Sequence, residues 1–315
     1  MTNVINQKSG KNWTNYHADC VEVAQSLPSD SIHHSIYSPP FKSLYTYSNS
    51  ERDMGNCRDD ETFWKHYKFL IAEQFRVMMP GRIVAVHCMN LPTSKSFHGY
   101  IGISDFRGEI IRAFQEAGFI YHSEVTIWKD PVTAMQRTKA LGLLHKQVRK
   151  DSCMSRAGIP DYLCCFRKPG ENPKPVSHTP QTYAVEHWQR VASPVWASFC
   201  DFDEHGFLVA AGRKNGGDPC GIDPGDTLQR EGAREHNDER HICPLQLEVI
   251  ERSIELYSNP GEIIWSPFSG IGSEGYVAVR RNRKFIGSEL KESYWKHGCM
   301  NLLSAENERD QKELL

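Results

Sequence analysis

Residues 38–41, Ser-Pro-Pro-Phe, place a hydroxyl group, two prolines and an aromatic ring at the end of a short β-type run, HHSIYS. The two prolines fix two φ angles and remove two backbone donors, so the chain leaves the strand in one stiff direction. Such a corner can serve as a rigid platform for a flat ligand. Pro-Pro also marks many ordinary loops, so the motif alone leaves a platform and a simple strand exit both open.

A second candidate site lies near the other end of the chain, in GEIIWSPFSGIGSEGYVAVRRNRKFIGSEL. The pattern is strand, glycine turn, helix, strand and acid. Gly270 and Gly272 allow a sharp turn that brings main-chain amides close to a ligand. Glu289 follows at the tip of the next strand, where a carboxylate can bind ribose hydroxyls. The turn lacks the Gly-Lys-Ser/Thr of a triphosphate loop, so the pattern favours a nucleoside-type cofactor over ATP hydrolysis, with a purely structural turn as the alternative.

The elements that must position these two motifs alternate between strands and helices. Hydrophobic spacing and cap residues predict strands at 33–38, 82–88, 119–129, 262–266 and 284–290, and helices at 60–79, 105–118, 244–258 and 273–281. Residues 14–27 predict a strand end followed by a short helix. Pro80-Gly81 is expected to stop the helix predicted at 60–79. Alternation of this kind indicates an α/β fold with a doubly wound, mostly parallel, Rossmann-like sheet.

The middle of the chain has a different composition. Residues 131–156 are basic and predict partial helix, whereas residues 170–240 are rich in Gly, Pro, Asp and Arg with little periodicity. A long irregular stretch inside a compact enzyme is usually functional or disordered. The basic segment supplies the candidate DNA-binding residues, which are Arg137, Lys139, Lys146, Arg149 and Lys150. A solvated basic face is the alternative reading of the same charges.

Composition limits the class of protein. The net charge of −2 gives no global attraction to a polyanion, so any nucleic-acid binding must come from local patches. No stretch approaches the roughly 20 apolar residues that span a bilayer, and the N-terminus lacks the apolar core of a signal peptide, so we expect a cytoplasmic protein without membrane contact. The 10 cysteines form no CxxC pair, which argues against a zinc site, and we expect no metal.

Taken together, the two motifs resemble those of the amino-group DNA methyltransferases, which modify the N4 amine of cytosine or the N6 amine of adenine. The resemblance rests on Ser38-Pro39-Pro40-Phe41, on Ser266 to Gly272, and on Gly287-Ser288-Glu289. With the tetrapeptide first and the cofactor loop last, the order looks like the permuted β group of the family. Supporting segments are Tyr16 to Cys20 and His241 to Leu245, and the resemblance covers roughly 14–130 and 241–298.

The resemblance implies S-adenosylmethionine as cofactor and double-stranded DNA as substrate. It divides the chain into a catalytic half at 1–130, an inserted target-recognition region at 131–240 and a cofactor-binding half at 241–315. The implied catalytic residues are Ser38, Pro39, Pro40 and Phe41. The implied cofactor-binding residues are Asp19, Cys20, Ser266, Pro267, Phe268, Gly270, Gly272, Ser273 and Glu289. A cognate restriction endonuclease is an expected partner, and the chain is expected to be a monomer or a homodimer.

The chemistry explains why such an enzyme needs a stiff corner. An exocyclic amine on a base gives its lone pair to the ring and attacks poorly. Two acceptors, the Ser38 hydroxyl and a main-chain carbonyl such as that of Pro39, can draw the amine toward sp³ geometry, while Phe41 supplies a stacking face. The base must be flipped out of the duplex to reach the corner. With a cofactor loop elsewhere in the chain, the platform interpretation replaces the strand exit.

Several alternatives stay open. Ser in the first motif position favours cytosine N4, with adenine N6 as the alternative. RNA or a protein amide as substrate, and a non-catalytic nucleic-acid-binding relative, are two further readings. The family's cofactor strand usually ends in Asp, whereas this chain has Ser266 there, so another acid, Asp19 or Glu274, is expected to compensate.

Other polar residues near the expected pocket have less definite predictions. His87 and His98 flank a strand end and are predicted to be satisfied polar residues rather than site residues. Trp128 and Lys129 end a strand on the presumed ligand side, where a structural role and a DNA contact are equally open.

Overall fold

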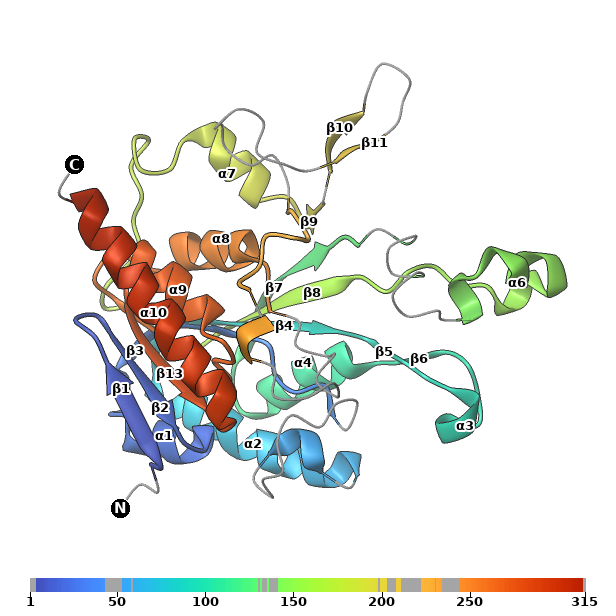
Figure 1. Ribbon diagram of the computed structural model, residues 1–315, viewed down its shortest axis with the longest axis horizontal. Coiled ribbons are helices and arrows are strands. Elements are labelled where there is room, and N and C mark those ends of the chain that lie inside the picture. Colours follow the sequence, from blue (N-terminus) through green and yellow to red (C-terminus); the bar gives the residue numbers. More distant parts are fainter. Residues whose placement is uncertain are drawn as a thin grey trace.

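The structure, a computed structural model, describes residues 4–42, 53–57, 59–129, 131, 135, 141–197, 199–202, 208–210, 222–229, 231–233 and 244–313. Its centre is a nine-stranded sheet (Figure 1). In spatial order the strands are β1 (Asn6–Ser9), β2 (Trp13–His17), β13 (Lys284–Glu289), β12 (Ile263–Ser266), β3 (Ile32–Tyr37), β4 (Met78–Met89), β8 (Asp161–Arg167), β7 (Ile120–Ile127) and β9 (Val195–Trp196). Strands from the two ends of the chain therefore lie side by side.

The inner part of the sheet is parallel. Strands β2, β13, β12, β3 and β4 pair in parallel, as do β7 and β9, whereas β8 runs antiparallel to both β4 and β7, and β1 runs antiparallel to β2. The expected mostly parallel α/β sheet is confirmed. Pairing of β12 with β3 joins the two predicted halves, since Ile264 is opposite His34 and Trp265 is opposite Ser35.

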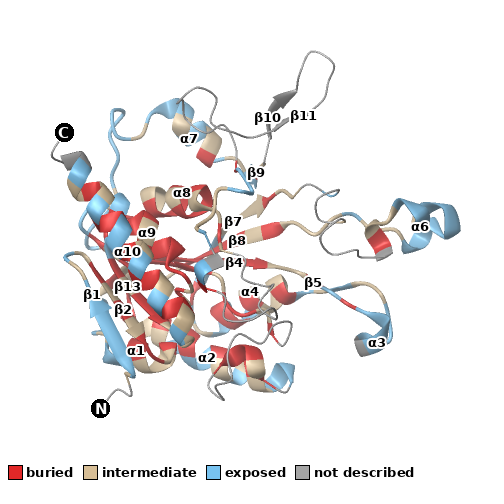
Figure 2. Cartoon of the chain, viewed as in Figure 1, coloured by how far each residue is buried: buried red, intermediate tan, exposed pale blue. Residues whose placement is uncertain are grey.

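Helices cover both faces of this sheet and enclose two apolar cores. One face carries α1 (Cys20–Ser26), α2 (Asp60–Val77) and α4 (Phe106–Glu116), and the other carries α8 (Leu247–Tyr257), α9 (Ser273–Arg280) and α10 (Glu292–Glu313). Figure 2 shows buried residues concentrated along the sheet and on the inward sides of these helices. The helices that follow strands thus bury one side against the sheet, as the doubly wound arrangement requires.

Local sequence signals account for the boundaries of α2 and α4. Asp59 caps α2 by accepting a hydrogen bond from the Thr62 amide at 2.7 Å, and Asp105 caps α4 by accepting one from the Gly108 amide at 2.9 Å. Gly118, with φ of 98°, follows the end of α4. These boundaries match the sequence expectations to within a few residues.

The prediction that Pro80-Gly81 stops a helix at Met79 is wrong. Helix α2 ends at Val77, and Pro80 and Gly81 lie inside β4. The register with β3 is interrupted between Ile32 and His34, which leaves extra β4 residues unpaired. A bulge tolerates proline, which lacks an amide donor, and a glycine at φ 73°, so the strand continues through the pair.

The range 131–240 does not behave as one insertion. Strand β8 falls within it yet lies between β4 and β7 in the main sheet. The structure therefore places Asp161–Arg167 in the main sheet rather than in an insertion, and Cys164 and Cys165 of this strand pack in the two cores. The other described elements of this range are η3 (Leu141–Leu143), α6 (His145–Lys150), η4 (Ser152–Met154), α7 (Val185–Val191), the hairpin β10 (Phe199–Phe202) and β11 (Leu208–Ala210), and η5 (Glu231–Ala233).

Two segments extend from the sheet toward the same side in Figure 1. One carries α6, and the other comprises β5 (Leu91–Pro92), α3 (Lys95–His98) and β6 (Ile103–Ser104). The second segment follows the end of β4, whereas α6 precedes β8. Among the described residues, no helix is long and apolar enough to cross a membrane.

The carboxyl ends of the parallel strands share one edge of the sheet. Ser38 follows β3, Pro267 follows β12, Asp19 lies just beyond β2, and Glu289 ends β13. Because β8 is antiparallel, its first residue, Asp161, lies opposite the end of β4 on this same edge. Ligands of open α/β sheets bind outside the carboxyl ends of the strands, so the fold brings the predicted motifs to the expected place.

Candidate active site

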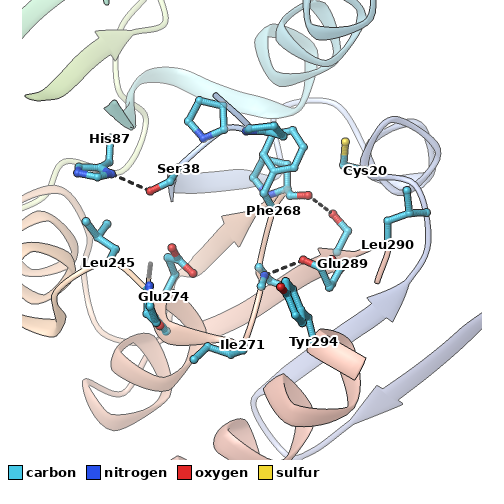
Figure 3. A pocket seen from close by; sticks show the side chains of 18 of the residues that line it. Cys20, Ser38, His87, Leu245, Phe268, Ile271, Glu274, Glu289, Leu290 and Tyr294 are labelled. Carbon is cyan, nitrogen blue, oxygen red and sulfur yellow. Dashed lines mark hydrogen bonds between the residues drawn. The ribbon is translucent and has the colours of Figure 1, made fainter. Parts of the chain in front are cut away.

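A pocket of about 270 Å³ opens at this edge of the sheet (Figure 3). Both distant motifs line it, so Ser38 and Gly270 face one common space. Its walls come from the ends of β2, β3, β4, β7, β12 and β13, from the start of β8, and from the first residues of α1, α9 and α10. The pocket therefore depends on the full set of strand pairings rather than on either motif alone.

Lys42, the residue directly after the Ser-Pro-Pro-Phe corner, anchors the corner to neighbouring helices. This residue is buried at φ 51°, and its ammonium group forms ion pairs of 2.7 Å with both Asp60 and Glu109. Phe41 packs edge-on against Phe106 with ring centroids 6.0 Å apart. The corner is thus tied to α2 and α4, which gives Ser38 a defined position at the pocket wall.

Buried polar residues hold the strand before the corner. The Tyr37 hydroxyl donates to Gln74 Oε1 at 2.9 Å, Gln74 Nε2 donates to Ser35 Oγ at 3.2 Å, and the Ser35 hydroxyl donates to the Trp265 carbonyl at 2.9 Å. This chain of hydrogen bonds connects α2 to β3 and β3 to β12. It fixes the catalytic strand relative to the cofactor strand.

Ser38 is in contact with a histidine. Its Oγ lies 2.8 Å from His87 Nδ1, and His87 Nε2 lies 3.2 Å from Asp161 Oδ2, in contact although not aligned as a hydrogen bond. Lys129 Nζ completes the row at 2.6 Å from Asp161 Oδ1. His87, predicted to be a satisfied polar residue near the pocket, has a hydrogen-bond partner, but it also lines the pocket, and that partner is the predicted catalytic serine.

Asp161 keeps a negative charge despite its burial. Burial alone would raise the pKa of its carboxyl group, but the interactions with His87 and Lys129 outweigh that effect and hold the pKa below its usual range. A charged Asp161 favours the His87 tautomer that carries its proton on Nε2. Nδ1 is then free to accept the Ser38 hydroxyl proton, which leaves the Oγ lone pairs facing the pocket.

The glycine loop forms a tight turn supported by α10. Gly270 and Gly272 have φ values of 50° and 85°, in the left-handed region that glycine tolerates. A Cβ on Gly272 would lie 3.1 Å from the carbonyl oxygen of Gly298 in α10, and Asn301 Nδ2 donates to the Ile271 carbonyl at 2.8 Å. Helix α10, which the sequence pattern does not predict, therefore supports this side of the loop.

Glu289 closes the loop from the neighbouring strand. Its Oε2 accepts the Gly270 amide at 2.9 Å and its Oε1 accepts the Lys291 amide at 2.8 Å. Burial raises the pKa of Glu289 to about 7, although these two backbone donors act in the opposite direction. Each carboxylate oxygen retains a further lone pair, so Glu289 can position the loop and still accept ribose hydroxyls.

The cofactor side of the pocket is rich in acids. Asp19 and Asp53, each a helix cap, lie there together with Glu289 and Glu274. Burial, reinforced by the charge of Glu289, raises the pKa of Glu274 to about 8. A space walled by buried carboxyl groups suits a ligand that carries positive charge. Within the described residues, no cluster of His, Cys, Asp and Glu has the arrangement of a metal site.

Most of the predicted site residues come together at this pocket. Those that line it are Asp19, Cys20, Ser38, Pro39, Pro40, Phe41, Pro267, Phe268, Gly270, Ser273 and Glu289. Ser266 and Gly272 do not line it: Ser266 is fully buried in β12, and Gly272 is the N-cap residue that precedes α9. Asp19 and Glu274, the two acids expected to compensate for Ser266, both line the pocket, and so does Asp161, to which the sequence assigned no role.

The predicted DNA-binding residues lie away from the pocket wall. Lys146, Arg149 and Lys150 are exposed on α6, whereas Arg137 and Lys139 fall outside the described residues. Lys129, for which a structural role and a DNA contact were both open, forms the ion pair with Asp161 inside the pocket. The structure thus assigns Lys129 to the site and leaves α6 as an exposed basic helix.

Comparisons with known proteins agree with this geometry. The family model N6_N4_Mtase, described as DNA methylase, matches residues 32–299. The type II methyltransferase M.BglII of Bacillus subtilis is 23% identical over 282 residues, which cover 89% of this chain and 66%, just under two thirds, of that relative.

Two solved structures share the fold over almost the whole chain. The PvuII DNA methyltransferase, titled cytosine-N4-specific, matches with a TM-score of 0.62 at 16% identity, covering 98% of this chain and 96% of that one. TTHA0409 of Thermus thermophilus, titled a putative DNA modification methylase complexed with S-adenosyl-L-methionine, matches with a TM-score of 0.61 at 19% identity, covering 91% and 93%.

Proposed function

This chain belongs to the N6/N4 family of DNA methylases, whose cofactor is S-adenosylmethionine, and we propose that it methylates the N4 amine of a flipped cytosine in double-stranded DNA. The observation that carries the proposal is the shared pocket of Ser38 and Gly270, in which Ser38 contacts His87 at 2.8 Å. A pocket with a rigid hydroxyl-bearing corner on one wall and a cofactor loop on the other fits transfer of a group between two bound molecules.

The corner prepares the amine for attack. With its proton donated to His87, Ser38 Oγ accepts a hydrogen bond from the exocyclic amine, and the Pro39 carbonyl accepts a second. These two acceptors favour an sp³ nitrogen with an available lone pair, and because Pro39 and Pro40 are buried and rigid, they are in place before the base arrives. Phe41 lies at the pocket wall, where it offers a face for the base to stack on.

The amine must also lose a proton in the reaction. Ser38 Oγ takes this proton as its own hydroxyl proton passes to His87 Nδ1, 2.8 Å away. The resulting imidazolium is stabilised by the Asp161 carboxylate, which Lys129 holds in place. His87 thereby acts as the base, and Asp161 and Lys129 orient it. No covalent intermediate is required.

Residues at the other end of the pocket fit the cofactor. S-adenosylmethionine supplies a methyl group activated on a sulfonium. Glu289 retains lone pairs for the ribose hydroxyls, the glycine loop presents its backbone, and the acidic wall complements a cationic ligand. Cys20 and Leu290 add apolar surface beside Tyr294, where an adenine ring would be enclosed.

The choice of cytosine N4 over adenine N6 rests on Ser38. A neutral hydroxyl that is hydrogen-bonded to a histidine takes the place of the Asp or Asn that resembles the adenine enzymes. The basic helix α6 is the proposed contact with DNA phosphates, and each neutralised phosphate contributes salt-dependent affinity. We further expect a cytoplasmic enzyme, with a cognate restriction endonuclease as partner, acting as a monomer or a homodimer.

Mass spectrometry of nucleosides tests the proposal directly. The purified chain is incubated with duplex DNA and labelled S-adenosylmethionine, and the digested DNA is analysed for N4-methylcytosine and N6-methyladenine. We expect label in N4-methylcytosine. Label in N6-methyladenine would move the assignment to the adenine branch, and label only with RNA or protein would overturn DNA as substrate.

A variant links the product to the site. Ser38→Ala should retain cofactor binding and DNA binding but lose most of its turnover, because the amine loses an acceptor and its path to His87. Full activity in Ser38→Ala would refute the role of the corner. Absence of cofactor binding by the wild-type chain in a titration would instead favour a non-catalytic DNA-binding protein.

A further inference from the structure

The cofactor strand of this chain lacks an acid at its end. Ser266 takes that position, and the structure places it in the sheet, opposite Gly287 and out of the pocket wall. The Ser266 hydroxyl is buried and has no hydrogen-bond partner among the described residues. It therefore cannot meet the charge of a ligand bound outside the strand end.

Glu274 occupies a position from which it can pair with a positively charged group of a ligand in the pocket. It lies in the first turn of α9, directly after the glycine loop, and its side chain lines the pocket while remaining only 5% exposed. In the view of Figure 3, Glu274 lies between Leu245 and Ile271 on the side of Ser38, whereas Glu289 lies near Leu290 and Tyr294. The two acids thus lie toward different ends of the pocket.

The environment of Glu274 leaves its charge unmatched. Among the described residues, no cationic side chain pairs with it, and the interactions that affect its charge are its own backbone amide and the repulsion from Glu289. The other titratable side chains that line the pocket are Asp19, Cys20, Asp53, His87, Lys129, Asp161, Glu289, Lys291 and Tyr294. Of the cations among them, Lys129 is paired with Asp161, and Lys291 lies over the ring of Tyr294.

We propose that Glu274 is the anionic partner of the α-ammonium group in the methionine part of S-adenosylmethionine, in place of the missing strand-end acid. The inference rests on the proposed cofactor pocket and extends it by one named contact. A buried carboxylate without a partner is costly, so the free protein keeps Glu274 protonated at neutral pH, and a bound ammonium group stabilises the ionised form. The position of Glu274 near Ser38 fits the methionine end, whereas Glu289 fits the ribose.

Three related ligands with different charges can show whether Glu274 pairs with the ammonium group or with the sulfonium group. S-adenosylmethionine has a sulfonium and an ammonium group, S-adenosylhomocysteine has only the ammonium, and 5′-methylthioadenosine has neither. An acid that pairs with the ammonium affects the first two alike and leaves the third unchanged. An acid that pairs with the sulfonium affects the first alone.

Titration calorimetry with these three compounds tests the contact without DNA or turnover. Glu274→Gln should weaken S-adenosylmethionine and S-adenosylhomocysteine by about 10- to 100-fold, as expected for loss of a charge-assisted hydrogen bond. Binding of 5′-methylthioadenosine should stay unchanged, which also shows that the variant is folded. The matched control Glu289→Gln should weaken all three compounds, because each of them contains ribose.

Unchanged affinity of Glu274→Gln for S-adenosylhomocysteine overturns the proposal, and loss restricted to S-adenosylmethionine reassigns Glu274 to the sulfonium. A wild-type measurement needs no variant: S-adenosylhomocysteine that lacks its α-amino group should bind at least about 10-fold more weakly than the parent compound. Equal affinities would exclude the contact. Failure of the wild-type chain to bind S-adenosylmethionine at all refutes the proposed function itself, which is a distinct outcome.

Proton release provides a second readout. Because the pKa of Glu274 is raised to about 8 in the free protein, its carboxyl group is mostly protonated at neutral pH and must ionise to pair with a cation. Binding of S-adenosylhomocysteine near pH 7 should therefore release a proton, detected as a dependence of the binding enthalpy on the buffer's ionisation enthalpy. Glu274→Gln should lose that part of the release, and an unchanged release would contradict the assignment.

Discussion

Replacing Glu274 by glutamine should stabilise the free protein at alkaline pH, even though it weakens cofactor binding. Burial raises the pKa of Glu274 from 4.5 to about 8 in the folded chain. Between these two values the folded state binds more protons than the unfolded state, so the free energy of unfolding falls as the pH rises. The protonated carboxyl group contributes its full stability below about pH 4.5 and loses it through about pH 8.

The raised pKa of Glu274 also sets the size of the stability difference between Glu274→Gln and wild type. Each pKa unit corresponds to about 1.4 kcal/mol, so a rise from 4.5 to about 8 sets an upper limit of roughly 5 kcal/mol at alkaline pH. Local relaxation and water entry from the open side of the pocket reduce such penalties. We therefore expect Glu274→Gln to be more stable than wild type by about 2–4 kcal/mol at about pH 9 and nearly equal to it at about pH 4.5.

Urea unfolding of the cofactor-free protein at these two pH values measures the difference. Glu292→Gln is the matched control, because Glu292 is a surface acid in the first turn of α10 and pairs with Lys296. Its effect should be small, as for other exposed ion pairs. Saturating S-adenosylmethionine should reduce the advantage of Glu274→Gln, since it binds the folded wild type more tightly.

A stability difference between Glu274→Gln and wild type that is the same at both pH values would refute the reasoning. It would mean that Glu274 is not held in its neutral form by burial and the charge of Glu289. A destabilised variant at alkaline pH would show instead that the Glu274 carboxylate has a favourable partner in the free protein. Either result would also remove the basis of the ammonium contact.

Three further predictions concern other parts of the site. His87→Gln should lower the single-turnover rate of methyl transfer by about 100-fold or more, with cofactor affinity unchanged; an unchanged rate would exclude the proton path. Gly272→Ala should cost about 1–3 kcal/mol in urea unfolding, from its φ of 85° and a 3.1 Å contact with a backbone oxygen of α10. Gly261→Ala, with similar φ but open space around it, should cost less. Removing the charge of Lys146 or Arg149 should lower the salt slope of DNA binding by about one each; unchanged slopes would indicate a solvated basic face.

Local chemistry made the two ends of the site predictable. The Ser38–Phe41 corner and the glycine turn with Glu289 are short segments whose conformations follow from proline and glycine themselves. Their meeting in one pocket followed from the rule that parallel strands present their carboxyl ends at one edge. The sequence therefore locates those parts of the pocket that depend on short motifs and on a general property of the sheet.

The His87–Asp161 contact could not be found in this way. The two residues are 74 positions apart in the sequence, and they meet only because β8 pairs antiparallel with β4, with Asp161 opposite Met89. Nothing in the local pattern of DYLCCF gives the direction or the neighbour of that strand, and it was assigned to an insertion. His87 itself was noticed as a residue near a strand end, but a single histidine has too many roles for that position to identify one.

Helix α10 was missed for a different reason. Its last residues, ENERDQKE, are charged and dilute the apolar stripe formed earlier by residues such as Trp295 and Leu302. One of these charges is structural: the Glu306 carboxylate is buried and accepts the backbone amides of Lys11 and Asn12. Polar residues that satisfy distant backbone groups do not follow a hydrophobic period, so the sequence pattern does not reveal them.

The arrangement of charge in the pocket explains why the two ends of the site need different side chains. At the proposed base end, interactions with His87 and with Lys129 hold the pKa of Asp161 below its usual range, so a proton on His87 would be stabilised while the corner itself stays neutral toward a neutral amine. At the proposed cofactor end, no cationic side chain among the described residues pairs with Glu274, and burial raises its pKa to about 8, so it is mostly protonated in the free protein at neutral pH. We expect the ammonium group to form a charge pair there with cofactor and demethylated product alike, so that only the sulfonium charge, which the product lacks, distinguishes their interactions with the acidic wall. Electrostatics alone therefore favour exchange of product for fresh cofactor at this pocket.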